Sequence, residues 1–276
     1  MKTLYVSDLD GTLLNSNSIV SENSKLIINR GIELGLLFSV ATARTPATVM
    51  KLLEDVKVQL PMVLMTGALT YDKHRNIYTD VRSFSEKTTE VITGIIEDKG
   101  LSAFMYIVDN NHLKVFYKEA RSELEKRFIK EREGSPYKTF HIVNSYYKLS
   151  HSHVPVLFFI MDDFKKLDAL REEIKDIRGI NTFCYRDIFD TSKGYLEIFS
   201  EGTSKAEAVK RLASAAAADR LIVFGDNLND LPMFSIADES YAMENAFPEV
   251  KAAATGIIKS NDQDGVAEFL KIKHRL

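Results

Sequence analysis

The fold of this chain is decided near its start by the stretch Leu4-Tyr5-Val6-Ser7-Asp8-Leu9-Asp10-Gly11-Thr12-Leu13. The apolar beginning of this stretch has the length of a buried strand, and two carboxylates follow where that strand ends. Gly11 allows the chain to turn immediately. Because open α/β sheets bind ligands at the carboxyl ends of their strands, the stretch predicts an α/β fold with a polar site at that edge.

Short apolar runs alternate with helical segments at both ends of the chain. The expected strands are residues 4–7, 36–41, 62–65, 195–199 and 221–224, and the expected helices are residues 21–34, a segment from Thr45-Pro46 onward, 205–217, 231–236 and 265–272. Such alternation is typical of parallel βαβ units. We therefore expect the two ends to form one Rossmann-like three-layer core with a mainly parallel sheet.

The middle of the chain has a different pattern. Residues 103–108 and 113–117 have strand character and flank an Asp109-Asn110-Asn111 turn, which predicts a β-hairpin. We expect an α+β domain at residues 84–190, inserted into a core made of residues 1–83 and 191–276.

Length and composition narrow the classes of function. The chain has 276 residues, and its net charge of -3 gives no concentrated basic surface for nucleic acid or an acidic membrane. The single cysteine, Cys184, excludes an internal disulfide and a zinc site with several thiolates. The first apolar run is too short for a secretory signal or a membrane span, so a cytoplasmic location is expected. The oligomeric state is left open, and a monomer is compatible with the sequence.

The two aspartates after the first strand suggest either of two chemistries. Asp8 and Asp10 would raise each other's pKa unless a cation lies between them, so the pair predicts a hard metal such as Mg²⁺ or an acid/base dyad. Taken alone, the pair is equally compatible with two solvated turn residues.

Two further segments predict binding of an anion. Thr42-Ala43-Arg44 follows the strand at residues 36–41 and precedes a helix start, where a hydroxyl, backbone N–H groups and the helix dipole favour an anion. A turn hydroxyl and a surface arginine are the alternatives here. Lys205 occupies the first turn of a helix with a Ser204/Glu207 capping pattern, which suggests an anion nearby or else an ordinary exposed lysine.

The last polar segment is the most informative. Gly225-Asp226-Asn227-Leu228-Asn229-Asp230 follows the buried strand at residues 221–224. Such a concentration of acceptors is costly without a cation or donors, so Asp226 is a candidate metal ligand and Asp230 a candidate orienting residue. The alternative is a structural loop with helix-capping residues.

Taken together, these four segments resemble the haloacid dehalogenase superfamily, specifically its Cof-type phosphatases with a type IIB cap. The resemblance spans the whole chain. Its matching segments are residues 8–14, 41–44, 196–198 leading to Ser204-Lys205, and 225–230.

The resemblance implies a division of roles among these residues. Asp8 attacks phosphorus, and Asp10 protonates the leaving oxygen and then activates water. Mg²⁺ is held by the Asp8 carboxylate, the Asp10 backbone carbonyl and Asp226. The groups implied to contact phosphate are Leu9 N–H, Thr42, Ala43 N–H, Lys205 and Asn229, and those in supporting roles are Thr12, Arg44 and Asp230.

The sequence departs from the family pattern at three positions. Ala43 and Ala206 replace glycines, and Thr66-Gly67 stands where Asn-Gly is more typical. Ala43 keeps its backbone N–H, although the added methyl narrows the approach of phosphate. Thr66 changes a side chain that the resemblance places on the substrate side.

The expected activity is hydrolysis of small-molecule phosphate monoesters, with sugar phosphates as the leading substrate class. A sugar phosphomutase or phosphotransferase and a non-catalytic phosphometabolite sensor are the alternatives. A dehalogenase lacks the second aspartate, and a P-type pump would need membrane spans. The inserted domain would choose the substrate, but its His112, Tyr117, His151, His153 and Tyr185 are expected to be packing or surface residues.

Overall fold

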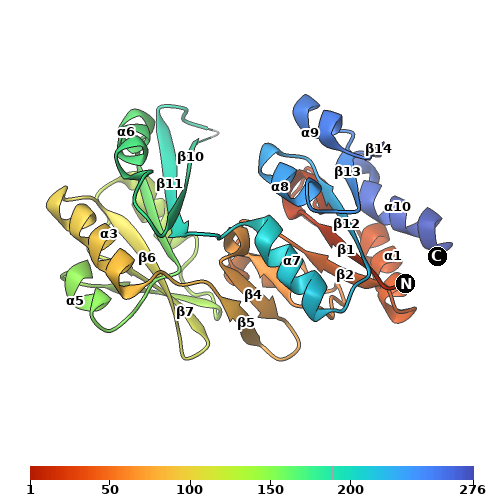
Figure 1. Ribbon diagram of the computed structural model, residues 1–276, viewed down its shortest axis with the longest axis horizontal. Helices are drawn as coiled ribbons and strands as arrows, with labels where there is room; N and C mark the ends of the chain where they lie inside the picture. The colour runs from red at the N-terminus through yellow and green to blue at the C-terminus, as the bar shows by residue number, and fades with distance from the viewer. Residues whose placement is uncertain (188) are drawn as a thin grey trace. The chain divides into compact units, whose positions relative to one another are not determined.

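The computed structural model describes residues 1–187 and 189–276, and the chain forms two compact units (Figure 1). Unit 1 comprises Met1–Asp80 and Ser204–Leu276, and unit 2 comprises Val81–Thr203. Residue 188, which belongs to the segment predicted as an insertion, lies outside the described residues.

Unit 1 is built around a parallel sheet. Its strands have the order β14-β13-β12-β1-β2, and every neighbouring pair is parallel. They are β1 (Thr3–Ser7), β2 (Leu37–Val40), β12 (Arg220–Gly225), β13 (Glu239–Met243) and β14 (Gly256–Ile258). The predicted mainly parallel core sheet is confirmed for four of its strand segments, residues 4–7, 36–41, 62–65 and 221–224, the third joining through a parallel bridge between Ala41 and Val63.

Helices cover both faces of this sheet. They are α1 (Glu22–Glu33), α2 (Pro46–Leu52), α7 (Lys205–Ala215), α8 (Leu231–Phe234), α9 (Pro248–Ala253) and α10 (Gly265–His274). Parallel crossovers are right-handed, and the sheet grows in opposite directions from β1 and from β12, so α1 and α8 cover opposite faces. The last helix, α10, packs against α1, and its Phe269 contacts the rings of Phe224 and Tyr241.

Local signals in the sequence set the helix ends. The Ser21 side chain accepts a hydrogen bond from the Ser24 N–H at the start of α1, and Gly35 follows its end with φ +93°. Pro46 occupies the first turn of α2, where a missing N–H costs no hydrogen bond. Among the described residues, none of the helices combines the length and the apolar composition that crossing a membrane would require.

A small three-stranded sheet comes next in the chain. It consists of β3 (Met62–Leu64), β4 (Leu69–Asp72) and β5 (Ile77–Val81), in that order, and β3 and β4 are antiparallel. The turn between β3 and β4 carries Thr66 and Gly67, both at positive φ. Of these strands, β3 was predicted from the sequence, and β4 and β5 were not.

Unit 2 contains a six-stranded sheet in the order β10-β11-β9-β6-β7-β8. Its strands are β6 (Ala103–Asp109), β7 (His112–Tyr117), β8 (Lys138–Ile142), β9 (Leu157–Asp163), β10 (Ile180–Arg186) and β11 (Lys193–Ser200). All neighbouring pairs are antiparallel except β7 and β8. The predicted hairpin is present, with Asn110 and Asn111 at positive φ in its turn.

The two faces of this sheet are covered differently. Its helices are α3 (Glu86–Asp98), α4 (Glu123–Lys130), α5 (Tyr146–Ser150) and α6 (Phe164–Ile174). Residues of α3, α5 and α6 form one apolar cluster with alternate residues of the strands, such as Ile160 and Leu196. On the opposite face, Phe128 of α4 packs against the rings of Phe104, Phe140 and Phe159.

The expectation for residues 195–199 is wrong in one respect. These residues form a strand, β11, but it pairs with β9 and β10 and therefore belongs to the sheet of unit 2. The second boundary between the units accordingly lies between Thr203 and Ser204, and not between residues 190 and 191. The alternating apolar pattern of β11 suits either sheet, so the error reflects a pairing that only distant residues determine.

Candidate active site

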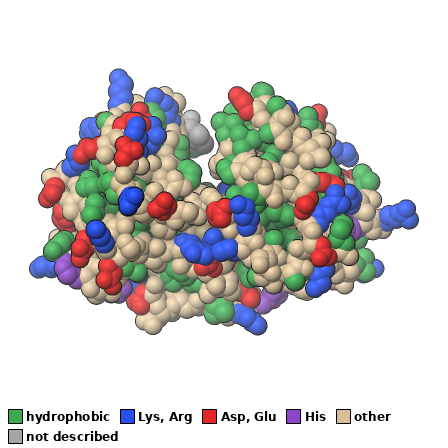
Figure 2. Space-filling model, viewed as in Figure 1, with side chains coloured by type: hydrophobic (Ala, Val, Ile, Leu, Met, Phe, Trp, Pro, Cys, Tyr) green, Lys and Arg blue, Asp and Glu red, His purple; other side chains and the backbone are tan. Residues whose placement is uncertain are grey.

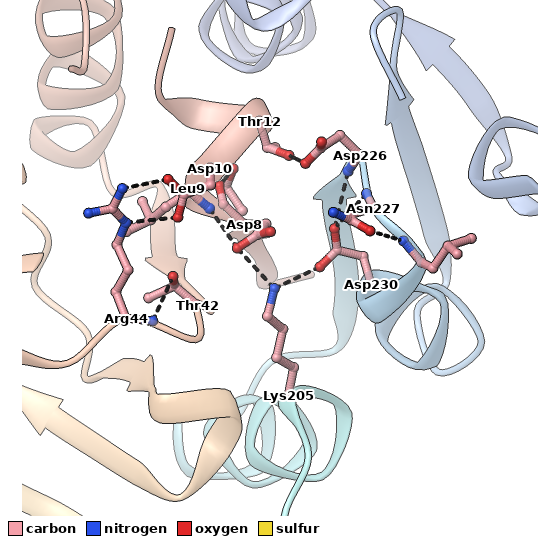
Figure 3. A network of polar contacts seen from close by, with 12 residues as sticks. Asp8, Leu9, Asp10, Thr12, Thr42, Arg44, Lys205, Asp226, Asn227 and Asp230 are labelled. Atoms are coloured by element: carbon pink, nitrogen blue, oxygen red, sulfur yellow. Dashed lines mark hydrogen bonds and ion pairs between the residues drawn. The ribbon is translucent and has the colours of Figure 1, made fainter. Parts of the chain in front are cut away.

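Asp8 lies directly after β1, at the carboxyl end of an interior strand of the parallel sheet (Figure 3). It is only 5% exposed, and its backbone N–H donates to the carbonyl oxygen of Phe224, at 3.0 Å. The Ser7 hydroxyl donates to the backbone carbonyl of Asp8, at 2.7 Å, and the Leu9 N–H donates to Asp8 Oδ1, also at 2.7 Å. The main chain therefore holds this carboxylate at the edge of the sheet.

A buried lysine faces Asp8 from the first turn of α7. Lys205 is 2% exposed, and its Nζ lies 2.9 Å from Asp8 Oδ1 and 2.8 Å from Asp230 Oδ1. The Ser204 side chain caps this helix by accepting a hydrogen bond from the Glu207 N–H. The prediction of an anion near Lys205 is confirmed, and in this structure the anions are two carboxylates of the protein.

Asp10 points away from that lysine and pairs with Arg44 (Figure 3). Arg44 Nε donates to Asp10 Oδ2 at 2.8 Å, and Nη2 donates to Oδ1 at 2.6 Å. This two-point contact fixes the plane of the carboxylate. The side chain of Asp10 stays 54% exposed, so solvent and small molecules reach it.

Gly11 brings the turn after β1 against the loop after β12. It has φ +70°, and a Cβ added there would lie 2.3 Å from Asp226 Oδ2. The Thr12 hydroxyl donates to Asp226 Oδ1 at 2.8 Å. Only glycine permits this close approach, which places the Asp226 carboxylate beside the first loop.

The loop after β12 is organised by Asp230, which is fully buried. Its Oδ2 accepts the N–H groups of Asp226 and Asn227, at 3.1 and 3.2 Å, while its Oδ1 accepts from Lys205. The Asn227 side chain accepts from the Leu228 N–H at 2.7 Å. Asp230 therefore positions both the loop and the lysine, as the sequence suggested for an orienting residue.

Burial makes the carboxylates of this site costly to ionise together. Burial raises the pKa of Asp226 to about 6, against the Thr12 hydrogen bond, which lowers it. Burial likewise raises the pKa of Asp8 to about 7, although the Lys205 charge opposes this. Burial also disfavours the Lys205 ammonium, but Asp8 and Asp230 together outweigh that effect and raise its pKa. A cation near Asp8 and Asp226 would lower the cost of keeping both ionised.

The donor set suits a hard metal ion. Asp8, Asp226 and Asp230 each offer a carboxylate oxygen within 4.8 Å of the other two. Both oxygens of Asp230 already accept hydrogen bonds, whereas Oδ2 of Asp8 and Oδ2 of Asp226 accept none from the described residues. Two carboxylate oxygens are ligands that Mg²⁺ prefers. The Asp10 carboxylate is outside this group, and its contact with a metal through the backbone carbonyl stays a prediction.

The residues predicted to contact phosphate differ in their burial and in their hydrogen bonds. Thr42 is buried beside Arg44, and the backbone N–H of Arg44 donates to the Thr42 hydroxyl at 3.2 Å. Leu9 uses its N–H to bind Asp8, and Ala43 and Asn229 are exposed. Asn229 does not join the hydrogen-bond network of the described residues around Asp8. The phosphate contacts of all these groups stay predictions.

The five polar and aromatic residues singled out in the inserted segment have local partners. His112 Nε2 lies 3.2 Å from Thr139 Oγ1, and Tyr117 packs on Phe104. The other three are His151, His153 and Tyr185, which contact Tyr147, Ser152 and Glu197, respectively. These contacts agree with the expected packing and surface roles.

Asn245, which follows β13, was not among the site residues predicted from the sequence. Its Nδ2 donates to the Gly11 carbonyl at 2.7 Å, and its Oδ1 accepts from the Asn261 N–H at 3.0 Å. This side chain therefore holds the turn after β1 from the neighbouring part of the sheet. Its position just beyond the carboxyl end of a core strand is the signal that would have found it.

Comparison with known proteins assigns the chain to a family. Residues 5–270 match the haloacid dehalogenase-like hydrolases. The chain belongs to this family. The match includes all four motifs, so it confirms the resemblance drawn from them and shows that the chain is of a hydrolase family.

Individual relatives extend over nearly the whole chain. It is 29% identical to the 5-amino-6-(5-phospho-D-ribitylamino)uracil phosphatase YwtE of Bacillus subtilis, a match that covers 98% of this chain and 97% of that protein. The crystal structure of TM0651 from Thermotoga maritima has a TM-score of 0.79 at 24% identity and covers 99% of this chain and 97% of its own.

The haloacid dehalogenase-like fold extends through unit 2 as well. The subclass IIB sugar phosphatase BT4131 has a TM-score of 0.74 at 18% identity, with 100% of both chains covered. A likeness at this identity concerns the fold alone. It supports the expected α/β core with an inserted α+β domain of the subclass IIB form.

Proposed function

We propose that this hydrolase removes phosphate from small-molecule monoesters through an aspartyl-phosphate intermediate on Asp8. The observation that carries the proposal is the setting of this carboxylate. Oδ1 is held by the Leu9 N–H and by Lys205, while Oδ2 accepts no hydrogen bond from the described residues. A fixed carboxylate with one oxygen available is suited to attack phosphorus.

In the first step, an Asp8 oxygen forms a bond to phosphorus, and the bond from phosphorus to the ester oxygen breaks. The leaving oxygen takes a proton from the Asp10 carboxyl, which is exposed and lies two residues away. Lys205 offsets the charge that develops on the transferred group. Thr42 and the N–H groups of Leu9 and Ala43 would orient the phosphate.

In the second step, Asp10 accepts a proton from a water molecule as that water attacks the phosphorus of phospho-Asp8. The bond from phosphorus to the Asp8 oxygen breaks, which restores the carboxylate and releases inorganic phosphate. Arg44 would keep the Asp10 carboxylate in one orientation through its two hydrogen bonds.

Asp8 and Asp226 would hold Mg²⁺, with the Asp10 carbonyl as a further ligand. When bound, the ion would neutralise charge shared between the carboxylates and the phosphate. Thr12 and Gly11 keep Asp226 in place for this purpose, and Asp230 keeps its loop in place.

Unit 1 would act as the catalytic core, because it contains every residue named above. Unit 2 would act as the type IIB cap that selects the substrate, and we place this cap at Val81–Thr203, since β11 belongs to its sheet. Of the two phosphatases compared above, YwtE is named for a phosphorylated ribitylaminouracil and BT4131 is named a sugar phosphatase. We propose polyhydroxylated phosphate monoesters, sugar phosphates above all, as the substrate class, and a cytoplasmic location.

The test is phosphate release from a panel of sugar phosphates, nucleotides and a chromogenic ester. The wild-type protein should release phosphate only with Mg²⁺, and a chelator should stop it. Asp8→Asn should be inactive, and its circular dichroism should match the wild type.

A matched control is Asp219→Asn, which changes a carboxylate remote from Asp8 that accepts the Lys2 N–H. This variant should keep full turnover. Metal-independent turnover, or silence of the wild type across the panel, would contradict the proposal, and silence would favour a phosphomutase or a phosphometabolite sensor.

A further inference from the structure

The turn between β3 and β4 (Met65–Gly67) has an uncommon backbone conformation. Met65, Thr66 and Gly67 follow one another with φ of +49°, +56° and +92°. Residues other than glycine, asparagine and aspartate seldom adopt this left-handed conformation, and they adopt it singly and not in a row. Met65 is long and Thr66 is β-branched, so neither favours such a turn. Strain of this kind persists only where the surrounding structure enforces it, and it is concentrated at functional sites.

Backbone hydrogen bonds join this turn to the loop after β2. The Met65 N–H donates to the Arg44 carbonyl at 3.0 Å, and the Thr66 N–H donates to the Thr42 carbonyl at 3.1 Å. These two carbonyl groups lie on either side of Ala43, whose N–H is one of the groups proposed to orient phosphate. The turn therefore holds the loop both before and after that N–H.

The same turn packs against the first residues of α7. A Cβ added to Gly67 would lie 2.2 Å from the carbonyl oxygen of Ser204 and 3.1 Å from Cβ of Ala208. Ser204 caps this helix, and Lys205 is its first residue. Only glycine permits this approach, so a side chain at Gly67 would displace either the start of α7 or the turn itself. In both cases the distance between Lys205 and the loop after β2 would change.

The position of Lys205 matters because positive charge is local in this protein. Figure 2 shows acidic and basic side chains interspersed on the visible face, without a broad patch of one sign. Lys205 is 2% exposed, and its Nζ lies 2.9 Å from Asp8 Oδ1. A phosphate group beside Asp8 would therefore meet this ammonium group at one fixed place. A misplacement of about 1 Å at such a site can cost roughly 100-fold in rate.

We propose that the Met65–Gly67 turn is a positioning element of the phosphate site and that Gly67 is its positioning residue. The turn sets the distance between the loop at residues 42–44 and Lys205, so that one phosphate group meets both. This inference rests on the proposed phosphatase function, which assigns these two segments to phosphate. It adds that a third segment, remote from both in sequence, fixes their spacing.

The test compares two glycine variants with the wild type on a substrate found in the phosphate-release panel. Gly67→Ala should lower kcat by about 100-fold, because it changes the spacing around the phosphate. Gly35→Ala is the matched control, because Gly35 has φ +93° and no heavy atom lies within 4 Å of its added Cβ. It adds backbone strain without a contact, so it should lose stability but keep kcat within about twofold of the wild type.

Both variants are assayed at a temperature at which circular dichroism shows them folded, so a loss of stability alone does not change kcat. The same kcat in Gly67→Ala and Gly35→Ala would overturn the positioning role. Turnover of the wild type in the same assay separates this result from a failure of the proposed function.

Hydrogen–deuterium exchange of the wild type keeps the test decisive if Gly67→Ala does not fold. Inorganic phosphate with Mg²⁺ should slow exchange of the Met65 and Thr66 N–H groups by roughly fivefold or more, together with exchange at residues 42–44, and should leave α1 unchanged. Slower exchange at residues 42–44 without a change at Met65 and Thr66 would overturn the positioning role alone. No protection by phosphate anywhere, together with no turnover, would overturn the proposed function as well.

Discussion

The ammonium group of Lys205 lies 2.9 Å from Oδ1 of Asp8, and both side chains are almost completely buried. The same ammonium reaches Asp230 at 2.8 Å. Two carboxylates thus share one cation in an enclosed position. Desolvation makes such an arrangement expensive to keep for stability alone, so we interpret it as a site prepared for a phosphate group.

Lys205→Met should both destabilise the protein and abolish phosphate release. Removing the ammonium leaves Asp8 and Asp230 buried without their shared cation, which should lower the free energy of unfolding by about 3–5 kcal/mol. Urea unfolding measures this change. Lys210→Met, on the exposed side of the same helix, should alter neither quantity; equal effects of the two variants would show that the buried pair has no special role.

Gly11→Ala should weaken the response to Mg²⁺. The new methyl group would meet Asp226 Oδ2 at 2.3 Å and push that carboxylate away, so the Mg²⁺ concentration for half-maximal phosphate release should rise at least tenfold. Gly35→Ala is the matched control, because Gly35 also has positive φ but no heavy atom lies within 4 Å of the added Cβ. That variant should lose stability only. The same Mg²⁺ response in both variants would contradict the role given to Asp226.

Thr66→Asn should stabilise the protein by about 1 kcal/mol. Thr66 has φ +56°, a conformation that is costly for a β-branched residue and much easier for asparagine. Thermal unfolding should show a higher midpoint for Thr66→Asn and no gain for Thr66→Val, which keeps the branched shape. A lower midpoint for Thr66→Asn would mean that contacts of the threonine outweigh its backbone strain.

Lys138→Met should change how stability depends on pH. Lys138 is 2% exposed among the rings of Tyr106, Phe128 and Phe140, and burial lowers its pKa from 10.5 to about 7. Between those two pH values the unfolded chain binds more protons than the folded one. The wild type therefore gains stability as pH rises through that window, by at most about 1.4 kcal/mol per pH unit.

Chemical denaturation at pH 6.5, 8 and 9.5 checks this prediction. The free energy of unfolding of Lys138→Met should exceed that of the wild type most at pH 6.5, and the difference should shrink steadily toward pH 9.5. Lys130→Met changes an exposed position of α4, and its free energy of unfolding should depend on pH in the same way as that of the wild type. A constant difference between Lys138→Met and the wild type would show that this amine stays protonated across the range.

Much of the core could be predicted because the information is local. The apolar runs before Asp8, Thr42 and Asp226 have strand length, and polar residues follow each run directly. Parallel strands bring such ends to one edge, so the motifs predicted the grouping of Asp8 and Asp226, and the family resemblance added Lys205. The pairing of Asp10 with Arg44 could not be predicted from the sequence, because it depends on side-chain orientation across two loops.

The errors and omissions concern information that is not local. The alternation in β11 suits a strand of either unit, and its place was decided by pairing with β9 and β10. Asn245 looks like an ordinary loop residue until its contact with Gly11 is seen.

The most direct test of the aspartyl-phosphate mechanism is to look for phosphate bound to Asp8 during turnover. The protein is mixed with a substrate found in the phosphate-release panel and Mg²⁺, quenched in acid within milliseconds, digested, and analysed by mass spectrometry. We expect a peptide phosphorylated at Asp8 that disappears when the substrate is exhausted and is absent from Asp8→Asn. Full turnover without any phosphorylated peptide, or with undiminished rate in Asp8→Asn, would contradict it.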